Sequence, residues 1–135
     1  MKTLVRCSLL ALAAACSVPA QTTSAAIKAK VPFEFTVMGR TMPAGDYVVD
    51  RSNSSATVIL KCQEHRVSVI VPTDAAERIA TQQDAKLIFH RYGDQYFLSE
   101  IWGAGTDGRK LHKTKLERDL ALRDSPNRTV IEARR

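Results

Sequence analysis

Residues 87–102 read LIFHRYGDQYFLSEIW, and this stretch decides the fold class. Two apolar runs, residues 87–90 and 95–102, flank the polar segment Arg91-Tyr92-Gly93-Asp94. Glycine tolerates the positive φ that a tight turn between antiparallel strands requires. The pattern therefore predicts a β-hairpin that turns at Gly93.

Further strand patterns lie upstream of this hairpin. Residues 31–37 alternate apolar and polar side chains, which is typical of a strand with one buried face. Pro72 is expected to end a strand, and residues 73–84 fit a short helix. Six short strands separated by turns predict an all-β fold, a small antiparallel β-sandwich or barrel of about six to seven strands. Four of the expected strands lie before residue 73: residues 31–37, 47–49, 57–60 and 66–71. The first two are expected to form a hairpin with a long loop.

The aromatic residues define where the core lies. All eight fall between Phe33 and Trp102, so we expect the β domain to span residues 27–108. The 27 residues that follow contain no aromatic side chain and carry nine basic and four acidic groups. We therefore expect the core to be complete without the last eleven residues.

The C-terminal region has one clear helix signal. Thr114-Lys115-Leu116-Glu117 matches a capping box, which predicts a short helix from about residue 115 to 123. Residues 109–124 are interpreted as a basic helical appendage, and residues 125–135 as a disordered tail.

The N-terminus carries an export pattern. Lys2 and Arg6 precede an apolar stretch, residues 8–18, and Val18-Pro19-Ala20 supplies the small residues of a cleavage site. That stretch would span only about half of a ~30 Å hydrocarbon core, which favours a cleaved signal peptide, residues 1–20, over a membrane anchor. The alternative is a lipoprotein anchored through Cys16, because residues 12–16 resemble a lipobox. We expect a periplasmic or extracellular protein without a membrane span.

Two segments resemble a family of small exported proteins of soil bacteria. They are VPFEF with PAGDY, residues 31–35 and 43–47, and FHRYGDQYFLSEIW, residues 89–102. The resemblance implies export and a β-rich fold, and it carries no activity, substrate or catalytic residue.

Polar and aromatic residues crowd the predicted hairpin and form the candidate ligand site. Tyrosine and tryptophan rings stack on sugars when they are exposed, and acids and bases beside them supply polar contacts. The structural alternative is a cross-strand ladder that only stabilises the sheet. The candidate ligand-binding residues are His90, Tyr92, Asp94, Tyr96, Glu100 and Trp102.

A second group, Cys62-Gln63-Glu64-His65, combines a thiol, a carboxylate and an imidazole. Structural zinc sites use four ligands, usually in paired spacing, and the chain has no partner pair such as a second Cys-x-x-Cys, so we interpret Cys62 as structural and expect no metal. The motifs of common hydrolases and nucleotide-binding enzymes are missing, and we assign no catalytic residue and no cofactor.

These observations predict an exported, non-enzymatic envelope module that binds a ligand or has a structural role. Its expected partner is an envelope glycan or protein, and export argues against nucleic acid. The alternative is a small envelope enzyme that uses the polar residues of the 87–102 hairpin.

Overall fold

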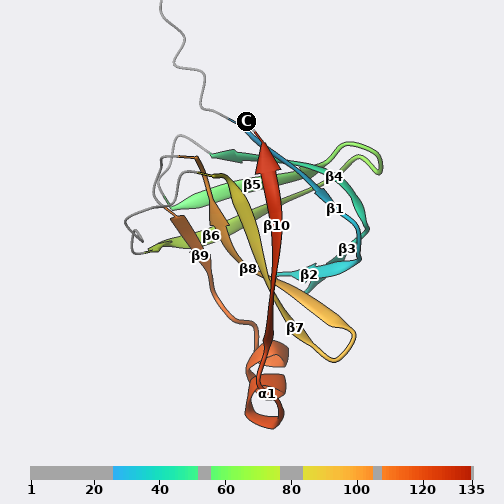
Figure 1. The fold of residues 1–135 in the computed structure, drawn as a ribbon, viewed down its shortest axis with the longest axis vertical. Coiled ribbons are helices and arrows are strands. Elements are labelled where there is room, and N and C mark those ends of the chain that lie inside the picture. Colours follow the sequence, from blue (N-terminus) through green and yellow to red (C-terminus); the bar gives the residue numbers. More distant parts are fainter. Residues whose placement is uncertain (1–25, 52–55, 77–83, 105–107, 135) are drawn as a thin grey trace, which may run out of the picture.

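The computed structural model describes residues 26–51, 56–76, 84–104 and 108–134. The expected signal peptide, residues 1–20, and Cys16 within it lie outside the described residues. Figure 1 shows strands wrapped around a common interior, with one helix at one end. The elements are β1 (Ile27–Val31), β2 (Phe35–Val37), β3 (Arg40–Met42), β4 (Gly45–Arg51), β5 (Thr57–Cys62), β6 (Val67–Ala76), β7 (Lys86–Tyr92), β8 (Gln95–Trp102), β9 (Gly108–Leu111), α1 (Lys115–Arg123) and β10 (Asn127–Arg134).

Eight of these strands close into an antiparallel barrel. Their order is β8-β7-β10-β1-β4-β5-β6-β9, and β9 pairs back onto β8. The remaining two strands form a small hairpin, β2–β3, which joins the barrel through a parallel contact between Thr36 and Phe97. The all-β prediction is confirmed in its barrel form, with more strands than the six to seven expected.

The β7–β8 hairpin confirms the prediction made from residues 87–102. Tyr92 and Gln95 are paired, so Gly93 and Asp94 form a two-residue turn. Gly93 has a φ of +59°, in the left-handed region that glycine adopts without steric cost. The register shifts between Ile88 and Phe89, which bends the hairpin into the curve of the barrel.

The strand predicted for residues 31–37 is interrupted, which corrects the expected long-looped hairpin. Proline has no backbone N–H, and pairing stops at Pro32. β1 pairs instead with β4, and β2 turns into β3 through Met38 and Gly39, whose φ angles are +50° and +77°. Two successive positive φ values are the signature of a type I′ hairpin turn.

β6 continues through Pro72, so the prediction that this residue ends the strand is wrong. The N–H of Thr73 donates to Ala56 O on the β5 side. Successive residues of a strand direct their N–H groups to opposite sides, so Pro72 faces the β9 side at the point where β9 pairing ends. The missing donor therefore lies at the end of the β6–β9 ladder and leaves the hydrogen bonds to β5 intact. Residues 73–76 are strand, whereas the rest of the helix predicted to residue 84 lies largely outside the described residues.

The C-terminal region contributes two barrel strands, which corrects both the appendage and the disordered tail. β9 lies between β6 and β8, and β10 lies between β7 and β1. Backbone pairing on both sides holds these two strands without aromatic side chains, so the absence of aromatic residues misled the prediction. The helix is confirmed: it spans Lys115–Arg123, and the N–H of Glu117 donates to the Thr114 hydroxyl at 3.3 Å.

The barrel interior is filled by alternate side chains of its strands. Phe35 makes edge contacts with Tyr47 and Phe89, each at 5.1 Å between ring centroids. The Tyr47 hydroxyl donates to Pro43 O four residues upstream, an arrangement known as a tyrosine corner. The largest fully buried side chains are Tyr47, Phe35, Phe89, Phe97, Met42, Leu60, Leu87, Ile88, Ile101, Val31, Val37 and Val49.

Candidate functional site

The hairpin residues predicted as a ligand site do not converge. Tyr96 packs on the core side, stacked on Phe33 with 3.8 Å between ring centroids. Asp94 is exposed in the turn, 3.8 Å from the Arg91 guanidinium. The remaining four candidates form two pairs, His90 with Tyr92 and Glu100 with Trp102.

His90 and Tyr92 lie beneath helix α1. His90 Nδ1 is 3.2 Å from Glu117 Oε1, and the Glu117 side chain is only 5% exposed. The Tyr92 hydroxyl is buried and has no hydrogen-bond partner in the described part of the chain. Burial, and then the nearby Glu117 carboxylate, raise the pKa of Tyr92. These contacts hold the helix against the barrel.

Glu100 and Trp102 form a second, structural contact. The Trp102 indole N–H donates to Glu100 Oε2 at 2.8 Å. The Trp102 ring also lies against Gly108, where an added Cβ would come within 2.6 Å of it. Tyr92 and Trp102 are 4% and 3% exposed, so neither ring offers the open face that stacking on a sugar requires.

Cys62 lies in the core beside the tyrosine corner. The thiol is free and buried, and among the described residues no group of three metal-ligating side chains exists. Burial first, then Cys62 and Glu64, raise the pKa of Tyr47. The surroundings of Cys62 fit a structural thiol.

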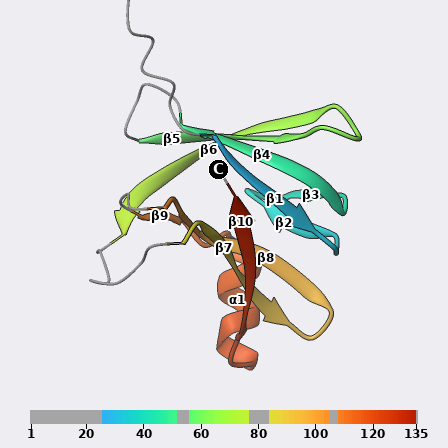
Figure 2. The ribbon, with the colours of Figure 1, turned by 45° about the horizontal axis from the view of Figure 1, so that its top comes forward.

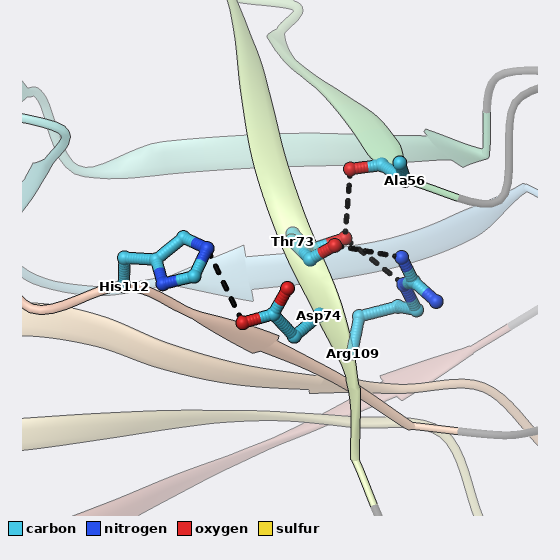
Figure 3. Close-up of polar contacts among 5 residues, drawn as sticks. All are labelled: Ala56, Thr73, Asp74, Arg109 and His112. Atoms are coloured by element: carbon cyan, nitrogen blue, oxygen red, sulfur yellow. Dashed lines mark hydrogen bonds and ion pairs between the residues drawn. The ribbon is translucent and has the colours of Figure 1, made fainter.

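A polar network fixes β9 to β6 (Figure 3). Arg109 donates through Nε to Thr73 Oγ1 at 2.9 Å and through Nη2 to Thr73 O at 2.8 Å. Directly after β9, His112 Nε2 lies 3.2 Å from Asp74 Oδ2 on β6. Sequence reasoning missed this network because it placed residue 73 in a helix and residue 109 outside the barrel.

A surface groove of a size that suits a small ligand lies elsewhere, across the outer face of β10, β1 and β4. It is a groove of about 550 Å³, built on backbone that the barrel ladder holds on both sides. Its lining residues are Lys28, Ala29, Lys30, Asp46, Tyr47, Val48, Gln63, Glu132 and Arg134.

The strand register arranges the groove's outward side chains in two rows. Lys28 is paired with Arg134 on one side and with Val48 on the other. Lys30 is paired with Asp46, and the same β1–β10 register extends to place Glu132 on its other side. One row therefore carries two adjacent cations, and the other carries a lysine between two acids. In the described part of the chain, no ion pair within 4.0 Å joins these groups.

Part of the groove had a signal in the sequence. Residues 27–31, IKAKV, alternate apolar residues with two lysines that face outward, which is a strand pattern. Arg134 and Glu132 had no such signal, because they were assigned to a disordered tail.

Comparisons of the chain with family models, with curated proteins and with solved structures found no match. In the described residues, no helix has both the length and the apolar character needed to cross a membrane.

Proposed function

We propose that this protein is an exported, non-enzymatic binding module whose ligand lies in the groove across β10, β1 and β4. The observation that carries the proposal is the groove itself, about 550 Å³ of space lined by charged side chains that make no ion pair with one another. Small-molecule sites are concave and use a few polar groups fixed on rigid elements. This groove is concave, and its polar side chains stand on strands that are hydrogen-bonded on both sides in the barrel.

The lining favours recognition over chemistry. Lysine, arginine, carboxylate and amide groups bind polar ligands through hydrogen bonds, and the half-buried Val48 offers a small apolar contact. The enzyme alternative depends on the 87–102 hairpin, where His90 contacts Glu117 and the rings of Tyr92 and Trp102 are buried. Those contacts engage or cover the groups that a substrate would need.

The N-terminal sequence pattern supports export. For an exported protein of this kind, we propose an envelope glycan as the ligand. Cleavage after Ala20 would give an envelope protein whose intact mass begins at Gln21. A lipid-modified Cys16 in the mass spectrum would replace cleavage after Ala20 with lipoprotein anchoring. Recovery of the uncleaved chain from the cytoplasm would contradict export.

The binding function is tested by filling the groove. Purified protein is titrated by calorimetry with neutral oligosaccharides, chitotriose and cellotriose, and with acidic trigalacturonate. Val48→Trp places a large ring on the groove floor, and we expect it to abolish binding of any sugar that the native protein binds. Ile70→Trp is the matched control, because Ile70 is exposed on β6 and does not line the groove. Equal binding by both variants, or binding of no sugar by the native protein, would contradict the proposal.

A further inference from the structure

Two cations of the groove, Lys28 and Arg134, lie where their repulsion lowers the stability of the fold. Lys28 and Arg134 are directly opposite each other on neighbouring antiparallel strands, where Cβ atoms lie about 4.5–5.5 Å apart. Like charges in this position destabilise a sheet. Lys61, in the same outer row across Val48, shows the usual solution, because its ammonium lies 3.5 Å from Asp50. Lys28 and Arg134 have no such acid among the described residues.

On the basis of the proposed binding function, we propose that Lys28 and Arg134 form a subsite for the carboxylate of an acidic sugar. A guanidinium presents a planar pair of donors that matches a carboxylate, and an adjacent ammonium adds a third donor and a second charge. A bound carboxylate would also remove the repulsion between the two cations. The ligand class is therefore a uronic acid or an oligosaccharide that contains one.

The second row of the groove explains why the ligand is a sugar rather than a dense polyanion. Asp46 and Glu132 flank Lys30, so this row has a net negative charge and disfavours ligands with closely spaced anionic groups. Carboxylates accept hydrogen bonds from hydroxyl groups, and Gln63, whose N–H donates to Asp46 O at 3.0 Å, sits beside this row. An acidic sugar satisfies both rows at once, with its carboxylate on Lys28 and Arg134 and its hydroxyls on the acids.

The decisive comparison removes the negative charges of the ligand's carboxylates and leaves the sugar unchanged. Trigalacturonate and its methyl ester share the same hydroxyls and differ in their carboxylates, and both are titrated into the purified protein by calorimetry. We expect the ester to bind at least about tenfold more weakly, which is the size of a charge-assisted hydrogen-bond contribution. Binding of the acid should also weaken as salt increases, because both cations are exposed.

The protein side of the test uses exposed residues, whose substitution leaves the core unchanged. Lys28→Gln and Arg134→Gln should each weaken trigalacturonate binding by about tenfold, whereas Lys61→Gln should change it by less than about twofold. Thermal unfolding of all three variants provides the folding control.

The outcomes separate this inference from the proposed function. Equal binding of acid and ester, blocked by Val48→Trp, would overturn the carboxylate subsite and leave the binding groove intact. If Val48→Trp binds the sugar as well as the native protein does, the groove is not the binding site. Inorganic phosphate that competes as effectively as the uronate would overturn the sugar assignment, because it would show recognition of a bare anion.

Discussion

At the scale of single residues, two buried tyrosines show that a buried hydroxyl group can either raise or lower the stability of the fold. The Tyr47 hydroxyl donates to Pro43 O and fixes the chain as it enters β4. The Tyr92 hydroxyl is buried beside Glu117 without a hydrogen-bond partner in the described residues. A satisfied buried hydroxyl contributes to stability, whereas an unsatisfied one retains its desolvation cost.

This contrast predicts opposite effects of removing the two hydroxyls. Tyr92→Phe should raise the free energy of unfolding by about 1 kcal/mol, because it removes an unpaired buried group. Tyr47→Phe should lower it by about 1 kcal/mol, because it removes a hydrogen bond. Urea denaturation measures both values, and a loss of stability in Tyr92→Phe would show that its hydroxyl has a partner in solution.

The same tyrosines predict how stability responds to alkaline pH. Burial raises the pKa of both above the unfolded value of about 10. A raised pKa in the folded state means that the unfolded chain releases its protons first, so stability is complete below about pH 10 and falls as pH rises further. Denaturation between pH 9 and 12 should show this fall, and Tyr92→Phe should make it shallower. An identical slope in the variant would contradict the assignment.

At the scale of elements, α1 is attached to the barrel in an unusual way. Its leucines 116 and 122 are 54% and 87% exposed, and Glu117 is its one buried residue. Glu117 reaches His90 on β7, and its N–H donates to the cap residue Thr114. The helix therefore depends on a polar anchor rather than on an apolar face. Figure 2 shows α1 at one end of the barrel, beside the start of β10.

Removal of that anchor should release the helix and leave the barrel intact. Glu117→Ala is expected to speed amide hydrogen exchange at least about tenfold in residues 115–123, because local opening then costs less free energy. Amides of β5 should keep their protection. Asp119→Ala is the matched control on an exposed position of the same helix. Equal exchange in the two variants would mean that other contacts hold α1.

Some elements of the fold could be predicted from the sequence and others could not. The β7–β8 hairpin was predictable because Gly93 and the flanking apolar runs carry local turn and strand signals. The helix was predictable from its Thr114 cap. The pairing of β10 between β7 and β1 was not, because it depends on partners about 40 and 100 residues distant, and local patterns do not specify them. The groove could not be predicted either, because β10 supplies Glu132 and Arg134 to its lining.

At the scale of the whole molecule, β10 completes the barrel and also forms one wall of the groove. Its half-buried side chains, Thr129, Ile131 and Ala133, face inward, and its outward residues include Glu132 and Arg134. Closure of the barrel and the proposed ligand binding therefore depend on the same eight-residue strand.

Deletion of residues 125–135 should consequently abolish cooperative folding, contrary to the expectation from composition. The deletion exposes one edge each of β7 and β1, and we expect it to cost most of a stability that is typically about 5–15 kcal/mol. Val130→Ala, at an outward position on the same strand, should change stability by less than about 0.5 kcal/mol. Calorimetry and circular dichroism measure both. A truncated protein that melts cooperatively within a few degrees of the native one would show that β10 is dispensable.

The proposed ligand site is the outer face of β10, β1 and β4. The most direct measurement is a nuclear magnetic resonance titration of the ¹⁵N-labelled protein with trigalacturonate, which locates the contact residue by residue. If this face is the site, saturable chemical-shift changes should be concentrated at residues 28–30, 46–48 and 132–134, with little change at residues 90–96. Changes concentrated in the β7–β8 hairpin, or none at any concentration, would contradict it.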